Sequence, residues 1–346
     1  VSVDPGTGSI SQKTSAGELV LLKPDGGAIA LFSTTRIVFA SHNYNLASRL
    51  YEHAFRRDAS GRGLAMGEIM RLAKINTSGD NKRNFTLLGD PALRLAWPWH
   101  GRIITDSING QSITEYNDTI MGLSELTISG HIEDRYGNMM NTFNTCLYTS
   151  LYDKGYETTS LANDGGQPYT YTIKDRVLFK GKTELVNGCF RISMLIPRDI
   201  DYTFGKGKLS YYAAGDYTDY TGSYEDFVIG GLANPAIIDT TGPVIELFLN
   251  DTLFRSGGIT DASPVLLARL SDDGSINTTG AGIGHDIVAI INNEQSNTII
   301  LNNYYENDPG TYKSGKIIYP LGKLERGEHS ICLLYTSDAA DEEDSV

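Results

Sequence analysis

Apolar positions near the start of the chain fall into short runs and helical stripes. Residues 27–34 read GAIALFST, a nearly all-apolar run typical of a strand covered on both faces, so we expect a central sheet strand there. Residues 85–88 predict another strand, followed by the turn signal GDP. Between them, Asn45 precedes two helical stripes, formed by Leu46, Leu50, Tyr51, Ala54 and Phe55 and then by Leu64, Ile69, Met70 and Ala73. This order of elements predicts an α/β layout for residues 1–98.

From about residue 102 onward the hydrophobic period becomes two. Residues 126–132, 189–196 and 244–249 alternate between apolar and polar positions, as half-buried strands do. Gly- and Asn-rich breakers separate such runs, and no long helical stripe intervenes, which favours β-sandwich domains. The segment DTTGP at 239–243 has the composition of a linker. We therefore expect one β-sandwich domain over 99–240 and a second over 241–331.

Both ends of the chain look cut. The first residue is Val1, and no basic flank with an apolar signal segment precedes it, so any targeting signal is expected upstream. Residues 332–342 read CLLYTSDAADE, which resembles one reading frame of a transposase adapter used in sequencing. We interpret residues 332–346 as a non-native tail, because small and acidic residues without periodicity cannot bury a face. The alternative is a natural acidic tail.

Charge and composition narrow the classes of partner. The formal net charge is −13, and it is −8 without the five acidic residues at 338, 341, 342, 343 and 344. This balance argues against nucleic acid as a partner, because phosphate binding needs clustered Lys and Arg. No apolar run approaches the roughly 18 residues that indicate a membrane helix. Cys146, Cys189 and Cys332 lack ligand-like spacing; the first two are either one disulfide or two buried thiols.

One group of candidate binding residues follows the first predicted strand. Ligand crevices of open α/β sheets form outside the carboxyl ends of strands. The residues at that end are Ser33, Thr34, Thr35 and Arg36, which we predict to line a substrate cleft. The alternative is a strand end that leads into a loop with a solvated Arg. His42 and His53 are predicted to be surface or packing residues, because residues 1–145 contain no Cys to pair with them.

A second group of candidates consists of oxygen ligands. The loop around residue 274 concentrates the hard ligands that Ca²⁺ prefers, although the spacing does not match an EF-hand. The candidate metal ligands are Asp272, Asp273, Asn277 and Asp286. The alternative is an ordinary turn, because Asp and Asn side chains also bond nearby backbone groups. In that alternative, His285 and Asp286 form a structural hydrogen-bonding pair at the start of a strand. No other cofactor is expected.

Several segments together resemble a known family. They are TSAGE at 14–18, GGAIALFSTTR at 26–36, NFTLLGDPALRL at 84–95, GHIEDRYGN at 130–138, IPRDI at 196–200, DTTGP at 239–243 and GIGHDI at 282–287. In this order they resemble the gingipain-type cysteine peptidases, and among these the sortases of the type IX secretion system. The resemblance implies the end of a caspase-like α/β peptidase domain, followed by all-β immunoglobulin-like sandwich domains.

The resemblance also implies an activity. Such a sortase is a cysteine peptidase and transpeptidase of the Gram-negative cell surface, associated with the outer membrane. It removes the C-terminal signal domain of secreted cargo proteins and attaches the cargo to a lipopolysaccharide acceptor, alongside other type IX secretion components. That chemistry needs a thiolate and an activating His. In the family both lie upstream of the segment that matches 14–18, so no residue here is matched to a catalytic role.

Two other classes remain open on the sequence. One is a non-catalytic, adhesin-like surface scaffold with a degenerate peptidase relative, which an upstream segment lacking the Cys would indicate. The other is a secreted gingipain-type protease outside the secretion machinery, which fits the β region less well.

Overall fold

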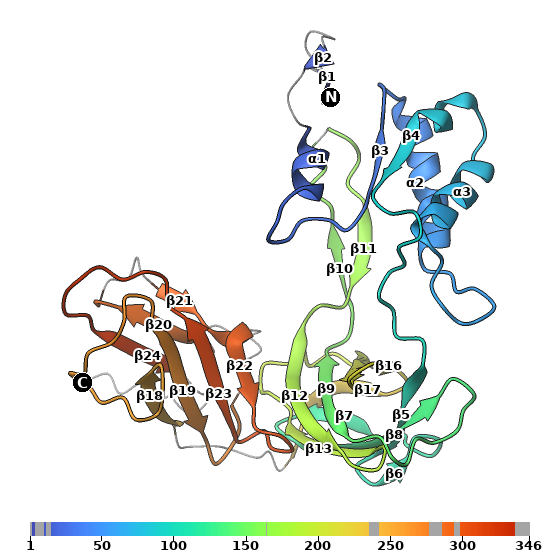
Figure 1. The fold of residues 1–346 in the computed structure, drawn as a ribbon. Helices are drawn as coiled ribbons and strands as arrows, with labels where there is room; N and C mark the ends of the chain where they lie inside the picture. Colours follow the sequence, from blue (N-terminus) through green and yellow to red (C-terminus); the bar gives the residue numbers. More distant parts are fainter. Residues whose placement is uncertain are drawn as a thin grey trace. The chain divides into compact units, whose positions relative to one another are not determined.

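The computed structural model describes residues 2–3, 10–11, 15–163, 165–234, 242–276, 286–293 and 298–335 of the 346 residues. The chain divides into two compact units, Val1–Trp99 and His100–Val346 (Figure 1). It is mostly β-sheet with few helices. None of the helices in the described ranges combines the length and the apolar character needed to cross a membrane.

The described residues of the first unit form three helices, a 3-10 turn and two short strand pairs. Its elements are β1 (Ser2–Val3), β2 (Ile10–Ser11), α1 (Ala16–Leu21), β3 (Leu31–Thr34), α2 (Ala40–Ala54), α3 (Met66–Ile75), η1 (Asp80–Asn84) and β4 (Phe85–Leu88). β1 pairs with β2, and β3 pairs antiparallel with β4. α1 begins at a capping box, in which Ser15 N donates to Glu18 Oε2 at 2.8 Å and Glu18 N donates to Ser15 Oγ at 3.3 Å.

The core of the first unit is small. It joins the apolar faces of α2 and α3 to β4 through Leu46, Met70, Ala73 and Phe85. The prediction for residues 27–34 is wrong in two respects. The strand begins only at Leu31, because Gly26 and Gly27 adopt positive φ in the preceding turn. β3 is half-buried rather than covered on both faces, with Phe32 packed against the core, and it is not a central strand, because β4 is its only strand neighbour among the described residues.

Arginine side chains hold the last residues of the first unit. Arg57 donates from both terminal nitrogens to the Pro98 carbonyl oxygen, at 3.1 Å each, and its guanidinium lies 5.8 Å from the Trp97 ring centroid. Arg62 lies over the Trp99 ring at 4.3 Å, in cation–π geometry. Residues 97–99 are therefore packed as part of this unit.

The first group of strands in the second unit forms two main sheets and one separate hairpin. The strands are β5 (Gly101–Ile108), β6 (Gln111–Ser112), β7 (Thr119–Gly122), β8 (Glu125–Asp134), β9 (Thr145–Tyr152), β10 (Tyr156–Thr159), β11 (Thr170–Ile173), β12 (Val177–Leu185), β13 (Cys189–Leu195), β14 (Gly205–Lys206), β15 (Lys208–Ala214), β16 (Asp219–Tyr224) and β17 (Val228–Leu232). The eight-stranded sheet has the order β12-β9-β15-β16-β5-β8-β13, with β6 paired to β5. The three-stranded sheet has the order β14-β17-β7.

These two sheets share one hydrophobic core. Alternation along β8 places Leu126, Ile128 and Ile132 in this core, where they join Ile120 of β7 and Ile229 of β17. The period-two prediction for residues 126–132 is confirmed by this burial pattern. β12 and β13 stand at opposite ends of the sheet order yet follow each other in the chain, and Val186 bridges to Cys189 at their junction.

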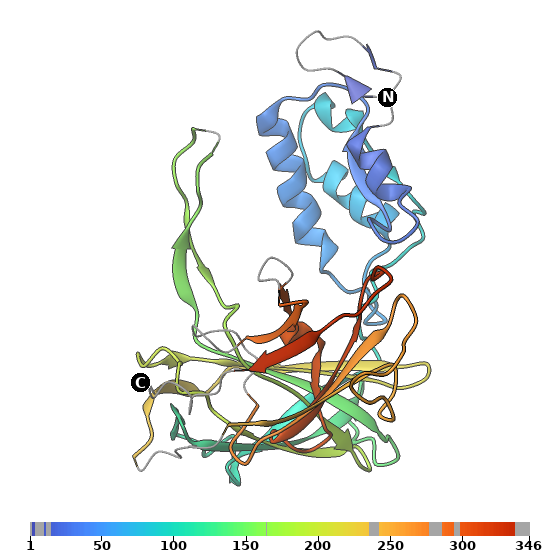
Figure 2. The same cartoon turned by 90° about the vertical axis from the view of Figure 1, so that its left-hand side faces the viewer.

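The hairpin β10–β11 extends away from the sheets of its own unit, as Figure 2 shows. Its base carries a buried ion pair, in which Lys154 Nζ lies 3.0 Å from Asp153 Oδ1. The Asp153 carboxylate also accepts hydrogen bonds from Lys154 N at 2.8 Å and from Asp201 N at 3.2 Å. Lys154 Nζ in turn donates to the Asp201 carbonyl oxygen.

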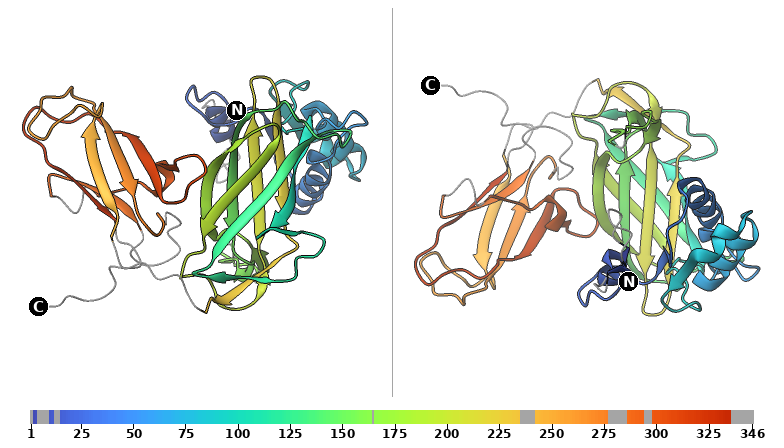
Figure 3. Two further views of the ribbon diagram at one scale, coloured as in Figure 1. Left: turned by 90° about the horizontal axis from the view of Figure 1, so that it is seen from below. Right: turned by 90° about the horizontal axis from the view of Figure 1, so that it is seen from above.

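The remaining strands form a second pair of sheets with a core of its own. They are β18 (Val244–Leu249), β19 (Val265–Ser271), β20 (Ile287–Ile291), β21 (Thr298–Ile300), β22 (Tyr305–Asn307), β23 (Ser314–Pro320) and β24 (Ile331–Tyr335), with the 3-10 turn η3 (Asn302–Tyr304). The sheet orders are β18-β19-β23-β22 and β21-β20-β24, and both sheets contribute to the core. Figure 3 shows the strands of each group side by side.

Two expectations about the cysteines and the tail are changed by the structure. All three thiols are free, and Cys189 is exposed, so the first pair forms neither a disulfide nor two buried thiols. Cys332 to Tyr335 form most of β24, where Cys332 pairs with Ile290. The start of the expected tail is thus part of a sheet, because its alternating apolar residues complete the edge of β20. Residues 336–346 lie outside the described ranges.

Candidate functional site

The predicted cleft residues lie at the end of β3. Ser33 pairs with Thr86 in β4, and Thr34 pairs with Phe85. Thr35 donates from its backbone N and from Oγ1 to the Asn84 carbonyl oxygen, at 2.8 and 3.0 Å.

Arg36 follows and is exposed. Because β3 and β4 are antiparallel, the carboxyl end of β3 meets the start of β4 and not a row of parallel strand ends. The structure thus brings Ser33, Thr34 and Thr35 to one strand end, and their contact with a substrate stays a prediction.

The two histidines of α2 have different surroundings. His42 is half-buried, and its Nδ1 lies 3.4 Å from Ser41 Oγ. His53 is buried, with Nδ1 3.2 Å from Arg56 and Nε2 2.9 Å from the Asn76 amide nitrogen. Arg56 can only donate, so Nδ1 accepts and Nε2 carries the proton, which requires the Asn76 amide to be turned to present its oxygen. His53 is therefore a packing residue held between Arg56 and Asn76.

The predicted metal ligands do not form a cluster in the described part of the chain. Asp272 is buried, and its Oδ1 accepts from Gly274 N at 2.8 Å, the pattern of an Asx turn. Asp273 is exposed, and Asp286 precedes β20. Asn277 lies outside the described residues. No group of three or more His, Cys, Asp or Glu residues within the described ranges is arranged to hold a metal. Binding of Ca²⁺ therefore stays a prediction.

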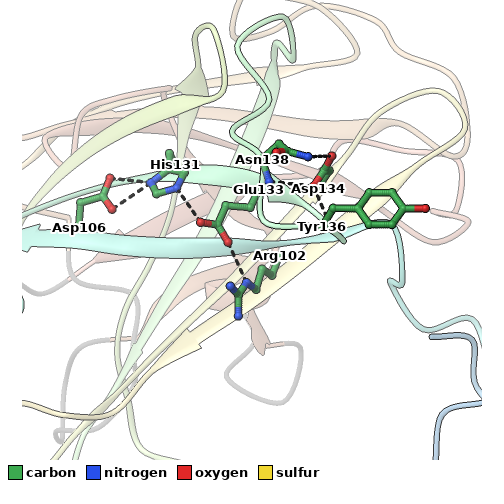
Figure 4. Close-up of polar contacts among 7 residues, drawn as sticks. All are labelled: Arg102, Asp106, His131, Glu133, Asp134, Tyr136 and Asn138. Atoms are coloured by element: carbon green, nitrogen blue, oxygen red, sulfur yellow. Dashed lines mark hydrogen bonds and ion pairs between the residues drawn. The ribbon is translucent and has the colours of Figure 1, made fainter. Parts of the chain in front are cut away.

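The most developed polar cluster lies on the outer face of the eight-stranded sheet (Figure 4). Alternation along β8 turns His131 and Glu133 away from the core, and an irregularity between Thr105 and Ser107 of β5 accommodates Asp106 opposite them. His131 Nδ1 lies 2.8 Å from Asp106 Oδ2, and its Nε2 lies 3.4 Å from Glu133 Oε1. Arg102 Nε donates to Glu133 Oε2 at 2.9 Å.

The charges of this cluster act on the imidazole. Burial lowers the pKa of His131, but the hydrogen bonds and charges of Asp106 and Glu133 outweigh burial, so the pKa is raised overall. Both ring nitrogens contact carboxylates, which favours the doubly protonated form. The cluster therefore ties β5 to β8 through the contacts of His131 with Asp106 and Glu133 and of Arg102 with Glu133.

A turn next to the cluster is held by Asp134. Its Oδ1 accepts from Tyr136 N at 2.8 Å and from Asn138 N at 2.9 Å, and its Oδ2 accepts from Asn138 Nδ2 at 3.0 Å. These bonds, with the Asn138 side chain contributing most, lower the pKa of Asp134. The segment at 130–138 thus combines a strand end with a rigid turn. Strand parity in the sequence indicates that His131 and Glu133 share a face, but not that Asp106 joins them.

The comparisons with known proteins agree with the motifs of the first unit. Residues 5–96 match the model of Peptidase family C25. The first unit therefore carries the similarity to the gingipain-type peptidase family that its sequence predicts, and that predicted resemblance is confirmed.

Among solved structures, the chain is similar to dimeric latent PorU from Porphyromonas gingivalis, with 27% identity and a TM-score of 0.45 over 88% of this chain. The chain spans 29% of the length of that PorU chain. It is also similar to the sporulation control protein Spo0M from Bacillus subtilis, at 13% identity and a TM-score of 0.24, over 70% of this chain and 93% of that one. This second similarity is too distant to support an argument about function. No match was found among the curated proteins.

Proposed function

We propose that this chain is part of a sortase of the type IX secretion system, a PorU-like cysteine peptidase and transpeptidase. The observation that carries the proposal is the match of residues 5–96 to Peptidase family C25. The motifs at 130–138, 196–200 and 282–287 support it, because they resemble the β region that follows the peptidase domain in such sortases. The reaction removes the C-terminal signal domain of a cargo protein and transfers the new carboxyl end to lipopolysaccharide.

The chemistry requires a nucleophile that the first unit does not contain. A thiolate attacks the scissile carbonyl, a His accepts the thiol proton, and backbone N–H groups stabilise the oxyanion. Residues 1–145 include no Cys. The family resemblance implies that the catalytic Cys and His precede the segment that matches 14–18, and we propose that they do so in the complete protein. Within this chain, Ser33, Thr34, Thr35 and Arg36 are proposed to line the cleft at the end of β3.

The β region is proposed to consist of two immunoglobulin-like sandwich domains. The support is that each group of strands forms two sheets that share one core. We propose that the complete protein acts on the extracellular side of the outer membrane of a Gram-negative bacterium. Its partners there are cargo proteins with C-terminal signal domains, the lipopolysaccharide acceptor and other secretion components.

A labelling experiment tests the proposal. The complete native protein is treated with a peptidyl acyloxymethyl ketone, which alkylates the activated thiolate of cysteine peptidases, and the modified residue is located by mass spectrometry. Labelling of one Cys upstream of Val1 is expected, with none at Cys146, Cys189 or Cys332. The 346-residue chain alone serves as the matched control and stays unlabelled.

Cargo processing distinguishes the three classes of protein. The complete protein, mixed with a cargo protein that carries its signal domain, is expected to release that domain and to join the cargo to added lipopolysaccharide. Release without transfer indicates a gingipain-type protease instead of a sortase. The absence of both labelling and release contradicts the proposal and indicates a non-catalytic, adhesin-like scaffold.

A further inference from the structure

β12 forms one edge of the eight-stranded sheet. Lys182 of β12 stands opposite Tyr148 of β9, and its backbone N–H and C=O are bonded on the side away from β9. Such outward backbone groups at a sheet edge are a template for pairing with another strand. The Asn307 side chain and the turn that contains Gly310 occupy this position beside Lys182.

The Asn307 amide takes the place of a neighbouring peptide group. Lys182 N donates to Asn307 Oδ1 at 2.7 Å, and Asn307 Nδ2 donates to the Lys182 carbonyl oxygen at 3.1 Å. Gly310 N donates to the same carbonyl oxygen at 3.0 Å. A carboxamide carries a donor and an acceptor side by side, as a strand backbone does, so it satisfies both groups of one edge residue at once.

The turn that presents Asn307 is itself held in place. Asn307 is 5% exposed, and its Nδ2 also donates to the Asp308 and Thr311 carbonyl oxygens, at 2.9 and 2.8 Å. Ser314 Oγ donates to Asp308 Oδ2 at 2.6 Å. The amide is thus oriented by its own turn before it meets β12, which lowers the entropy lost on docking.

Two further features fit the same contact. Lys182 Nζ forms an ion pair with Glu306 Oε2 at 2.7 Å, and this partner raises the pKa of Lys182. Gly181 carries no side chain, and a Cβ built there would lie 2.3 Å from Phe179 Cζ and 3.3 Å from Asn307 Oδ1. The glycine therefore accommodates chiefly the Phe179 ring and also leaves room for the amide at the edge.

We propose that the open edge of β12 is the docking surface for the strands of residues 242–335, and that Asn307 selects the position on that edge. The contact lies between strands with separate cores, those of residues 100–234 and those of residues 242–335. Removing it therefore releases one group of strands from the other and leaves both folded. The orientation of the two groups in solution depends on one side chain that imitates a strand.

Hydrogen exchange of the whole 346-residue chain tests the role of Asn307. With Asn307→Ala, the Lys182 amide is expected to exchange on the order of 10- to 100-fold faster, because its acceptor is lost. Amides of β9 and β19 keep their rates. The matched control is Asn302→Ala, which removes an equivalent bond from Ile287 N, 2.8 Å long, inside the second group of strands and leaves Lys182 protected.

Carbodiimide cross-linking provides an independent measurement. This reagent joins Lys182 to Glu306 by an amide bond when their side chains are paired, and mass spectrometry quantifies the linked peptide. The unsubstituted chain and Asn302→Ala are expected to give the link, and Asn307→Ala to reduce its yield at least severalfold. The proposal is overturned by an unchanged yield with an unchanged Lys182 rate. It is equally overturned if Asn307→Ala accelerates exchange throughout β19 and β20, since Asn307 is then a folding residue of its own strands.

Discussion

Replacing Asp153 by Ala should loosen the base of the hairpin β10–β11, because it leaves the Lys154 ammonium buried without its nearest counter-charge. Asp153 is 1% exposed and Lys154 is 8% exposed. The Asp153 carboxylate accepts three N–H groups, two from Lys154 and one from Asp201. All three lose their acceptor in Asp153→Ala.

The expected magnitude follows from this geometry. Removing one partner of a buried ion pair costs roughly 3–5 kcal/mol. Lys154 Nζ retains the Asp201 carbonyl oxygen, and the Asp201 carboxylate remains at 4.0 Å, so the lower end of the range, about 3 kcal/mol, applies. Because about 1.4 kcal/mol is a factor of ten in an equilibrium constant, local opening should become roughly 100-fold more frequent.

Hydrogen exchange resolved by segment is the appropriate assay, since a chain of several units does not unfold as a single two-state system. The amides of Lys154 and Asp201 report the opening directly. The matched control is Asp226→Ala, which removes a carboxylate at a similar distance, 2.7 Å from Lys206 Nζ, in a pair that is 79% and 66% exposed. Exposed pairs contribute about 0–1 kcal/mol, so this variant should change local exchange by at most about fivefold.

Two outcomes would refute the reasoning. If the Lys154 and Asp201 amides exchange at equal rates in Asp153→Ala and in Asp226→Ala, the cost of desolvation cancels the attraction between Asp153 and Lys154. A slow Asp201 amide in Asp153→Ala would mean that another group replaces the lost acceptor. The double change Asp153→Leu with Lys154→Met should recover most of the lost protection, because well-packed apolar groups often replace a buried ion pair without loss.

Three further predictions concern other parts of the chain. The pKa of His131 is raised, so its contacts with Asp106 and Glu133 stabilise the fold fully below about pH 6.5, and this contribution is lost as the pH rises through the folded-state pKa. His131→Gln should therefore lower the urea midpoint of β8 opening at pH 5.5 and leave it unchanged at pH 9. Arg62→Ala should shift tryptophan emission to the red and increase acrylamide quenching, because Trp99 loses its cation–π partner. The signal reports this region, since the two Trp residues of the chain lie at 97 and 99. Unchanged emission would contradict this packing. Ile37 and Phe39 are exposed beside a small core, so Ile37→Ser with Phe39→Ser should reduce aggregation of the isolated residues 1–99 in light scattering. Equal aggregation would show that other surfaces cause it.

The sequence predicts well those features that depend on local periodicity. The strand at 85–88 has the predicted bounds, and the helical stripes around Leu46 and Met70 form the faces that meet in the first core. The alternation at 126–132 correctly separates core from surface positions. In each case the side chains that reveal the pattern are the ones that are buried by it.

Features that depend on distant pairing are not visible in the sequence. Asp106 joins His131 only through a local irregularity of β5, which changes the strand parity at that point. Asn307 lies 125 residues from Lys182, and nothing in its local composition differs from an ordinary turn. The run at 27–34 also misleads, because Gly26 and Gly27 take positive φ and the strand begins only at Leu31.

The arginine contacts at residues 97–99 place the physical end of the first unit beyond the end of the family match at residue 96. Truncation at that match boundary would remove the Trp97 ring, whose centroid lies 5.3 Å from that of Phe55. Arg57 would lose the Pro98 carbonyl oxygen and the Trp97 ring, and Arg62 would lose the Trp99 ring. A domain boundary drawn from family similarity would thus expose an aromatic surface. Fusion, dissection or transplantation of this unit should use Trp99 as its last residue.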